Sequence, residues 1–533
     1  MNYPELKSRA EREARTRFPR ALVQLGGCTR TVGAGAVFSL LQSTVAKKGL
    51  MTPVLVAGCD GACHEAPVVM VEMAEGLAFR LTNVGPADVN EILGFWLAGQ
   101  ADASSTWKGR PALWPPPDDL PGFWKGQERR VMEAVGAIDP GSIDDYVARG
   151  GYATLDDVLR SMTPEQVVDE VSRADLRGRG GAYFPAGRKW QGARAAGPGP
   201  RYLIVNAEEG EPGIYKDRHV MEGNPFLLLE GLAIAAYAIG AARTYLYING
   251  EANAAAGRVE DALDQARDLA LAGDGVLGSD FTLDVEVRRG GGGYVLGEES
   301  ALMNSIEGQR NVPRTKPPFP VESGLWGRPT VINNVETLCN LPMLLANVGA
   351  DPSPGTKLIS LSGRVRRPGL VEAPMGITVR EIVFDIGGGP PDGCEVIGVV
   401  AGGPSGGLLN ESMLDVVIGP GMLDPEGAVL GSGGITVLDN SVSPVEVVRR
   451  LAAYNAAESC SKCTPCREGT KRMLDLLGAV QRGEEGPTGL EKLAYLNDVV
   501  GFGSLCGLGQ MAPGPVRSGL AHFKEAFDEA VGR

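Results

Sequence analysis

The spacing of apolar and polar residues divides the chain into regions that predict different secondary structures. Residues 1–20 carry charged residues at helical spacing and predict one exposed helix. An apolar strand at 21–25, a helix at 35–47, two strands within 52–58 and 67–73, and a helix at 87–99 follow. The chain therefore begins with a small unit in which strands and helices alternate.

The βαββα order of residues 1–99 suits a thioredoxin-like module. Residues 100–125 are rich in proline and predict an irregular linker. Residues 126–350 then alternate strands, such as 201–207 and 244–250, with helices at 226–242 and 251–271, and this order is typical of an α/β domain.

One apolar run in that domain, residues 226–242, has the composition of a membrane helix but not its length. It is interrupted by Glu230 and is shorter than the ~20 residues that a bilayer span needs. Asn224 and Pro225 before it are typical of a helix N-terminus. The run therefore predicts a buried core helix.

The last third of the chain changes from strands to helices. Residues 351–440 are rich in strands, from 357–363 to 434–439, with glycine turns and one helix start at 378–383, which predicts a β-grasp-like domain. Residues 441–533 are helical in pattern throughout and predict a bundle. The whole chain is thus expected to be a multidomain α/β protein.

Composition narrows the function classes. With 533 residues, 43% hydrophobic and 22% charged, the chain is an ordinary folded protein. A net charge of −14 argues against a nucleic-acid surface, and three histidines leave little room for histidine-driven hydrolysis. Nine cysteines in a chain of this length do not make a disulfide framework, and the N-terminus is no secretory signal. We expect a cytoplasmic protein without a direct membrane span, or one held at a membrane surface within a complex.

Three cysteines on a two-residue spacing are the strongest chemical signal. Cys460, Cys463 and Cys466 lie in a loop that leads into a helix, and Cys506 follows in a later loop. This spacing favours a [4Fe–4S] cluster, whose four irons each take one sulfur. A zinc site more often shows two separate cysteine pairs, and it stays as the alternative. The cluster reading predicts a one-electron carrier.

Three glycine-rich loops, residues 176–190, 205–218 and 290–300, lie in the α/β region. Glycines let backbone N–H groups approach a phosphate, and the first loop also carries several arginines and a lysine. The second places Glu208, Glu209 and Glu211 after a strand, at the edge where open α/β sheets bind ligands. Each loop alone is commonly structural. Together they favour one shared cofactor site.

The order of these motifs, from about residue 130 to the C-terminus, resembles the NADH-binding flavoprotein subunits of NADH:quinone oxidoreductase and the diaphorase subunits of NAD-linked hydrogenases and formate dehydrogenases. The resemblance implies a Rossmann-like FMN domain, an SLBB-type β-grasp domain and a bundle with a [4Fe–4S] cluster on Cys460, Cys463, Cys466 and Cys506. It implies FMN contacts at Gly178, Arg179, Gly180, Gly181, Lys189, Asn206, Glu208, Tyr294, Gly297, Glu298, Asn333 and Asn334. It implies NAD(H) contacts at Phe184, Glu211, Glu299, Lys316 and Phe319.

The cofactors form a chemically consistent set. NADH delivers a hydride and an iron–sulfur cluster accepts one electron, so a flavin must stand between them. Hydride transfer to a flavin needs no protein acid or base, and no catalytic residue is expected. The chain is therefore predicted to pass electrons between NAD(P)H, FMN, the [4Fe–4S] cluster and a partner. The implied partners are a thioredoxin-like [2Fe–2S] subunit and downstream iron–sulfur subunits of a larger complex.

Four positions depart from the family pattern. The family usually has Asp at Glu208, Gly at Tyr183, an aromatic residue at Gly192 and Arg at Asn249. These changes lie where the flavin edge and the nucleotide are expected. They keep open an alternative, in which the protein retains FMN and the cluster but no longer uses NAD(H). The sequence also leaves the choice of NADH or NADPH and the direction of electron flow open.

The N-terminal module is similar to the thioredoxin-like [2Fe–2S] domains fused to some of these diaphorases, which carry two early cysteines and a later C-x3-C pair. Cys59 and Cys63 match the later pair, but Cys28 is the one early cysteine. Three cysteines cannot supply four thiolates, and His64, beside Cys63, is the substitute that the sequence offers. We therefore expect no [2Fe–2S] cluster at these cysteines and a structural, docking role for the module. The cysteines at 339 and 394 are expected to be buried thiols.

Overall fold

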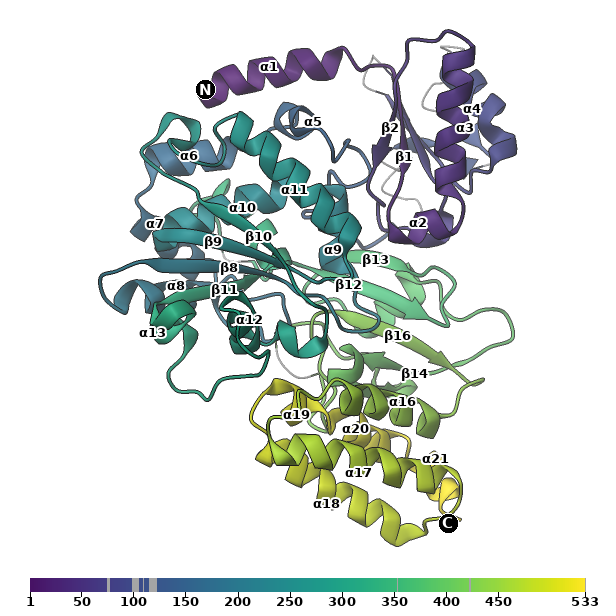
Figure 1. Cartoon of the computed structure of the whole chain (residues 1–533). Coiled ribbons are helices and arrows are strands. Elements are labelled where there is room, and N and C mark those ends of the chain that lie inside the picture. Colours follow the sequence, from purple (N-terminus) through teal and green to yellow (C-terminus); the bar gives the residue numbers. More distant parts are fainter. Residues whose placement is uncertain are drawn as a thin grey trace.

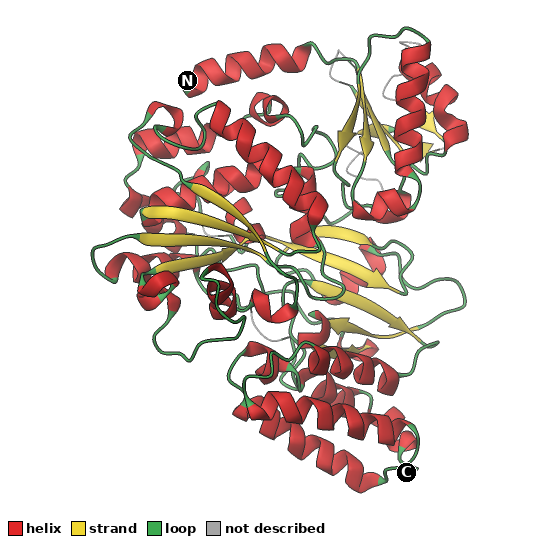
Figure 2. Ribbon diagram, in the orientation of Figure 1, coloured by secondary structure: helices red, strands yellow, loops and turns green. Residues whose placement is uncertain are grey.

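The computed structural model describes residues 1–73, 77–97, 105–108, 110–114, 122–351, 353–420 and 423–532. These residues form a mixed α/β protein with four packed regions: an N-terminal module, a parallel-sheet domain, a mixed-sheet domain and a C-terminal helical bundle (Figures 1 and 2). The multidomain α/β class expected from the sequence is confirmed. Figure 1 places the module and the bundle at opposite ends of the molecule, with the two sheet domains between them.

The N-terminal module is built on a five-stranded sheet in the order β2-β1-β3-β4-β7. Its elements are β1 (Arg20–Gln24), α2 (Gly27–Thr31), α3 (Ala34–Lys47), β2 (Val54–Ala57), β3 (Val69–Glu72), β4 (Ala78–Leu81), α4 (Val89–Leu97) and β7 (Leu113–Trp114). Strand β1 pairs parallel with β2 and antiparallel with β3. The predicted strands and helices are present, and α2, β4 and β7 are additional.

The segment predicted as a linker contributes to this module. Strand β7 pairs antiparallel with β4, and β5 (Thr106–Trp107) pairs with β6 (Arg110–Pro111). Residues 100–104, 109 and 115–121 of the predicted linker lie outside the described residues. The proline-rich composition concealed a two-residue strand because so short an element has no periodicity to detect.

Helix α1 (Tyr3–Arg15) does not pack on its own module. Its Leu6 and Ala10 are buried against α5 (Ile143–Ala148) of the parallel-sheet domain, and Figure 1 shows it crossing over that domain. The prediction of an exposed helix is therefore wrong for one face. The buried face of α1 consists of only two apolar residues, Leu6 and Ala10, so the many charged residues around them obscured it in the sequence.

The parallel-sheet domain has four strands in the order β10-β9-β8-β11: β8 (Arg201–Ala207), β9 (Ala241–Ile248), β10 (Val285–Arg289) and β11 (Thr330–Asn334). Successive residues of the strands face opposite layers. Leu203 packs in the core with α10, whereas Ile204 packs with Leu302 of α12. The helices around the sheet are α6 (Ala153–Ser161), α7 (Pro164–Arg173), α8 (Ala186–Ala195), α9 (Lys216–Gly223), α10 (Pro225–Ile239), α11 (Asn253–Asp268), α12 (Glu299–Ile306), α13 (Pro320–Ser323), α14 (Val335–Cys339) and α15 (Leu341–Leu345).

Helix α10 is the buried core helix that the sequence predicts. The Asn224 side chain accepts a hydrogen bond from the backbone N of Leu227 at 3.2 Å and so caps its start. The Glu230 carboxylate, which interrupts its apolar run, accepts hydrogen bonds from Tyr146 Oη at 2.5 Å and Tyr152 N at 2.8 Å. Among the described residues, no helix is both long enough and apolar enough to span a bilayer.

The mixed-sheet domain has five strands in the order β13-β12-β16-β14-β15. They are β12 (Thr356–Gly363), β13 (Gly369–Pro374), β14 (Val396–Ala401), β15 (Gly407–Asn410) and β16 (Gly434–Asp439). The predicted first and last strands lie side by side, because β12 pairs parallel with β16. The helix start predicted at 378–383 is a short π-helical turn at Glu381–Ile386.

The bundle contains α16 (Pro444–Ala457), α17 (Thr464–Gln481), α18 (Pro487–Gly503), α19 (Gly507–Met511), α20 (Gly514–His522) and α21 (Lys524–Ala530). Its core includes Val448, Met473, Leu477, Leu493 and Phe527. Near its end the predicted helical pattern is interrupted at Phe523, between α20 and α21, where the backbone is not helical. The helical character of residues 441–533 is otherwise confirmed.

Candidate functional site

The carboxyl ends of β8 and β11 form the floor of the site. Asn206, one residue before the end of β8, and Asn334, the last residue of β11, lie opposite each other in the parallel register. The Asn206 side chain donates from Nδ2 to the carbonyl of Gly297 at 3.0 Å, which fixes the third glycine loop above the strand ends. The loops after both strands therefore converge at one edge of the sheet, as open α/β sheets arrange their ligand sites.

A cavity of about 220 Å³ opens at this edge. The sequence-predicted residues that line it are Gly180, Asn206, Glu208, Glu211, Tyr294, Gly297, Glu298 and Asn334. Gly180 faces Asn334 so closely that a Cβ on it would lie 3.0 Å from the Asn334 Cβ. The close approach of the first glycine loop to the strand end thus favours glycine at 180.

Several lining residues were not in the predicted set. They are Glu209, Gly210, Ile214, Asp217, Val295, Ser432, Gly507, Leu508 and Met511. Glu209 and Asp217 belong to the second glycine loop and its following helix, so their presence could be read from the motif. Ser432 comes from the mixed-sheet domain and Leu508 from the bundle. The sequence pattern around these residues does not indicate that their domains pack over the edge of the parallel sheet.

The Arg179 side chain of the first glycine loop points away from the cavity. The backbone N of Arg179 donates to Thr337 Oγ1 at 2.8 Å, and its Nη2 donates to the carbonyl of Pro354 at 2.8 Å. The buried guanidinium lines a different cavity of about 500 Å³, together with Arg129 and Arg173. Among the predicted FMN residues, Arg179 therefore supports the loop rather than the cavity wall.

Three further predicted FMN residues hold the loop framework. The backbone N of Gly178 donates to the Phe184 carbonyl at 3.0 Å and closes the first glycine loop. Gly181 has a φ of +115° and packs against the backbone of Gly431 in the mixed-sheet domain. The buried Asn333 accepts a hydrogen bond from Trp190 Nε1 at 2.9 Å, so its side chain anchors α8.

Two of the predicted nucleotide residues, Glu299 and Lys316, lie together beside the cavity, next to Glu298. Lys316 Nζ lies 3.0 Å from Glu298 Oε1 and 2.5 Å from Glu299 Oε1. Lys189 Nζ lies 3.7 Å from Glu299 Oε2 and donates to a backbone carbonyl of β11. Burial disfavours charge on Glu299, but the two lysines outweigh it and hold the pKa of Glu299 below its ordinary value. Phe184 and Phe319 are about half exposed, at 48% and 52%.

Glu211 joins the cavity to the mixed-sheet domain. Its carboxylate accepts hydrogen bonds from the backbone N of Ser405 at 3.1 Å, Ser405 Oγ at 2.5 Å and Ser432 Oγ at 3.3 Å. Burial raises its pKa to about 7, and these hydrogen bonds oppose the rise. The carboxylate predicted to meet the nucleotide thus also holds two domains together.

A buried ionic network lies beneath the floor. Lys216 Nζ contacts Asp217 Oδ1 at 2.7 Å, Glu336 Oε2 at 2.9 Å and Asn334 Oδ1 at 3.1 Å. Lys357 of the mixed-sheet domain contacts Glu336 Oε2 at 2.6 Å. Because Asn334 also donates to Asp217 Oδ2 at 2.7 Å, the network fixes the end of β11 from below.

Two of the departures from the family pattern compensate each other. Asn249 Nδ2 donates to Glu208 Oε1, whereas Glu208 Oε2 has no hydrogen-bond partner among the residues that the structure describes. Asn249, where the family usually has Arg, thus forms a hydrogen bond with Glu208, where the family usually has the shorter Asp. Burial raises the pKa of Glu208 to about 7, and the hydrogen bond from Asn249 opposes the rise.

We predict that Glu208→Gln stabilises the flavin-free chain more at pH 8 than at pH 5. The native state retains the proton between the ordinary pKa of 4.5 and about 7, so wild-type stability falls as pH rises through that window. The neutral amide removes this loss, which amounts to up to about 3 kcal/mol. Urea unfolding at both pH values measures the difference, with Glu260→Gln as the control, since Glu260 is partly exposed and pairs with Arg289 at the protein surface. An equal effect at pH 5 and pH 8 contradicts the prediction.

The other two departures do not fill the cavity. Tyr183 has a φ of +51° and is buried in the core of the mixed-sheet domain, so its ring points away from the sheet edge. Gly192 of α8 packs against α13, where a Cβ would lie 3.4 Å from Val321 Cγ2. Neither position blocks the half-exposed faces of Phe184 and Phe319.

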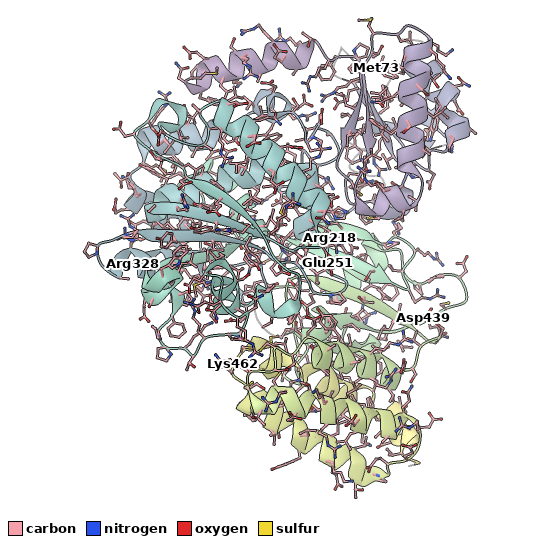
Figure 3. The ribbon with its side chains drawn as sticks, in the orientation of Figure 1. Met73, Arg218, Glu251, Arg328, Asp439 and Lys462 are labelled. Atoms are coloured by element: carbon pink, nitrogen blue, oxygen red, sulfur yellow. The ribbon has the colours of Figure 1, made fainter. Side chains whose placement is uncertain are left out.

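The four cysteines of the bundle line one pocket. Cys460, Cys463 and Cys466 come from the loop and first turn of α17, and Cys506 precedes α19. Lys462 donates to the Pro313 carbonyl and fixes this loop against the parallel-sheet domain, and Figure 3 shows Lys462 at the edge of the bundle that faces it.

The pocket and the cavity share a wall. Val295 and Leu508 line both of them. Across this boundary, Glu458 Oε2 accepts from the backbone N of Tyr294 at 2.9 Å, and Tyr454 Oη donates to the Gly210 carbonyl at 2.9 Å. The loop that carries the cysteines is therefore bonded to the glycine loops. The thiol-lined pocket and the cavity at the sheet edge are therefore neighbours.

Two protein-family models match these same regions. The Nuo51 FMN-binding domain matches residues 171–343, which contain the strand ends and all three glycine loops. The NADH-ubiquinone oxidoreductase-F iron-sulfur binding region matches residues 446–530, which contain the four cysteines. The donor set fits an iron–sulfur cluster, because four thiols surround one pocket whose other walls include Val295, Leu505 and Leu508.

The second of the NADH-quinone oxidoreductase F subunits of Rhizobium meliloti (strain 1021) is 44% identical to this chain over 405 residues, 74% of this chain and 96% of the relative. The chain belongs to the family of NADH-quinone oxidoreductase F subunits. The NADP-reducing hydrogenase subunit HndC of Solidesulfovibrio fructosivorans is also 44% identical, over 414 residues, 76% of this chain and 84% of HndC. A crystal structure of an NAD⁺-reducing [NiFe]-hydrogenase in the H₂-reduced state aligns with 96% of this chain and 84% of its own, at 28% identity and a TM-score of 0.66.

Membership in this family confirms the main prediction from the sequence. The chain is an NADH dehydrogenase-type oxidoreductase subunit, with FMN, a [4Fe–4S] cluster and NAD(H) as its cofactors. The hydrogenase subunits among its relatives agree with the resemblance to diaphorases.

Proposed function

We propose that the cavity at the ends of β8 and β11 holds FMN, and that NAD(H) enters past Phe184, Lys316 and Phe319. When bound, FMN exchanges a hydride with nicotinamide and single electrons with an iron–sulfur cluster. Gly180 and Gly297 give the backbone close approach, and Glu208, Tyr294 and Asn334 shape the wall. The pair Glu299 and Lys316 offers charged partners for the nucleotide beside this cavity.

The shared wall of Val295 and Leu508 is the observation that carries this proposal. It supports a [4Fe–4S] cluster on Cys460, Cys463, Cys466 and Cys506, directly beside the flavin. The protein side chains bind and orient the cofactors and exclude water, and none of them needs to act as an acid or base. The relatives' names include both NADH and NADP, so we propose NAD(P)H as the substrate without choosing between the two nucleotides.

We also propose the finer architecture that the sequence suggested. The mixed sheet of the N-terminal module supports a thioredoxin-like fold, the parallel sheet a Rossmann-like FMN domain at residues 126–350, and the sheet at residues 351–440 an SLBB-type β-grasp domain. Residues 441–533 form the cluster-bearing bundle. As one component of a larger assembly, the chain is proposed to work in the cytoplasm or at the membrane surface.

The exit for electrons is proposed to lie on α18. Tyr495, Val499 and Phe502 form an exposed apolar stripe there, with Tyr495 74% and Phe502 87% exposed, and α18 ends beside Cys506. A stripe of this kind marks a protein contact. We propose that a partner iron–sulfur protein docks on it, such as a thioredoxin-like [2Fe–2S] subunit or a downstream component of the complex.

Adding NADH or NADPH anaerobically to the protein loaded with FMN and iron–sulfur cluster tests the proposal. We expect at least one nucleotide to bleach the visible flavin band at once, because the faces of Phe184 and Phe319 stay open. Dithionite serves as the control reductant. A flavin that dithionite reduces but neither nucleotide does would contradict the proposal and favour a relay protein without nucleotide binding.

A further inference from the structure

Three cysteines of the N-terminal module meet one histidine of the parallel-sheet domain. Cys28 lies in α2, Cys59 and Cys63 lie in the loop after β2, and His219 lies in α9. Cys63 Sγ is 3.6 Å from Cys28 Sγ and 4.0 Å from Cys59 Sγ, and His219 Nε2 is 4.0 Å from Cys28 Sγ. All four ligand atoms lie within 4.8 Å of one another.

We infer that these four side chains bind one Zn²⁺ ion between the two domains. A tetrahedral zinc site with Zn–S bonds of about 2.3 Å has sulfur atoms about 3.8 Å apart, close to the observed separations. A [2Fe–2S] cluster divides its ligands between two irons and needs two pairs farther apart. Three thiolates and one imidazole, with no open position, are a common structural zinc set.

The imidazole is held in the orientation that metal binding needs. His219 Nδ1 lies 2.8 Å from the carbonyl oxygen of Tyr215, one turn earlier in the chain. A carbonyl can only accept, so Nδ1 carries the proton and the lone pair of Nε2 faces the sulfur atoms. The side chain is buried, with 8% of His219 exposed.

The histidine that the sequence offered does not join the group. His64 Nδ1 lies 3.2 Å from the carbonyl oxygen of Pro368, and its ring packs on Phe123 with centroids 5.0 Å apart. Its neighbour Cys63 belongs to the cluster, but the His64 ring faces the mixed-sheet domain instead. The fourth ligand comes from a distant segment, which is why cysteine spacing alone indicated an incomplete site.

The surfaces around the four ligands are fitted to each other. The backbone N of Gly27 donates to Glu222 Oε2 at 3.2 Å, which joins the Cys28 loop to α9. A Cβ on Gly58 would lie 2.3 Å from the Cα of Gly223, so only glycine permits this contact. Arg129 donates to the carbonyl of Asp60, beside Cys59, at 2.7 Å and brings a positive charge near the thiolates.

The position of the site indicates its role. Helix α9 carries His219 at the module, and near its start it carries Asp217, which lines the proposed flavin cavity, and Lys216, which lies beneath the floor of that cavity. Figure 3 shows Arg218 of the same helix where the module, the parallel-sheet domain and the mixed-sheet domain meet. Zinc has no redox chemistry in proteins. The ion therefore fastens the module to the helix that supports the cavity, and the module is a docking element rather than an electron relay.

Metal analysis of the whole protein tests the inference. We expect protein purified anaerobically without chelators, with its affinity tag removed, to contain about one zinc and about four irons per chain. About six irons without zinc would show a binuclear cluster at this site and overturn the inference. About four irons without zinc would overturn it as well.

Matched variants locate the ion. Cys28→Ser and His219→Ala are expected to lose the zinc and keep the iron, whereas His64→Ala and Cys394→Ser keep both. Full zinc content in Cys28→Ser and His219→Ala contradicts the inference. If His219→Ala does not fold, His219→Cys decides, because zinc X-ray absorption should change from three sulfurs and one nitrogen to four sulfurs. Iron and flavin content in the same samples report separately on the proposed function.

Discussion

Cys506→Ser is expected to remove the iron–sulfur cluster while the chain keeps its flavin. Iron content should fall from about four per chain to near zero, because each iron of the cubane takes one cysteine sulfur and serine oxygen is a poor substitute. The cavity keeps its floor and glycine loops, since Cys506 lines only the neighbouring pocket. NADH should still bleach the flavin, but one-electron transfer to an external acceptor should fall to background.

Iron analysis, the visible spectrum and a one-electron acceptor assay measure these three quantities on one preparation. Cys394→Ser is the matched control, because Cys394 is half-exposed and lies beside Arg364 in the mixed-sheet domain. The sequence predicted buried thiols at 339 and 394. This prediction is confirmed for Cys339, which is fully buried, and is wrong for Cys394. A Cys506→Ser protein with wild-type iron content would contradict the assignment of the four ligands.

Glu336→Gln is expected to cause the largest loss of stability outside the cysteine sites. The Glu336 carboxylate contacts Lys216 and Lys357, and all three side chains are fully buried. Removing its charge leaves two buried ammonium groups: Lys216 keeps its contact with Asp217, and Lys357 keeps hydrogen bonds to the carbonyls of Leu358 and Ser432, which costs about 3–5 kcal/mol. The thermal midpoint should fall by roughly 10 °C at pH 7.

The pH dependence of this loss is a second check. Burial lowers the pKa of Lys357 to about 8, and its attraction to Glu336 opposes the fall. Because the unfolded state binds the lysine proton more tightly, stability gains from Lys357 deprotonation as pH rises from about 8 toward 10.5. Without the Glu336 charge the pKa of Lys357 falls further, so the variant releases this proton at a lower pH than the wild type does. The Glu336→Gln deficit should therefore be smaller at pH 9 than at pH 6, and adding Lys357→Met should restore part of it.

An exposed ion pair supplies the control for this prediction. Glu484 contacts Arg482 at 2.6 Å, and both side chains are more than half exposed. Glu484→Gln should change stability by no more than about 0.5 kcal/mol, because solvent screens such pairs. Equal midpoints for Glu336→Gln and Glu484→Gln would show that the buried network does not stabilise the fold.

Helices and strands with a clear apolar run or a clear capping signal were predictable from the sequence. The strand predicted at 201–207, with its apolar run at 202–205, is the parallel strand β8, and Asn224-Pro225 marks the start of α10 as expected. Strand β10 was not predicted, because Val285–Arg289 alternates apolar and charged residues at a sheet edge and carries little apolar signal. Short strands such as β7 have no period to recognise.

The sequence predicted the site residues whose place depends on the glycine-loop motifs. It did not predict those whose place depends on contacts between domains. Asn206, Glu208 and Gly297 line the cavity because their glycine loops end at the sheet edge. Arg179 belongs to the same motif, yet its side chain turns toward Pro354, a choice set by packing of the neighbouring domain. His219 reaches the module cysteines by domain docking, which no spacing rule reports.

Rapid mixing of NADH with the anaerobic protein, followed by freezing and EPR, tests the central claim most directly. The claim is that flavin and cluster lie on either side of Val295 and Leu508 and exchange electrons within this one chain. We predict a reduced-cluster signal that follows flavin bleaching without any partner protein, and its absence in Cys506→Ser. A flavin that NADH reduces fully beside a cluster that stays oxidised, although dithionite reduces it, would contradict this claim.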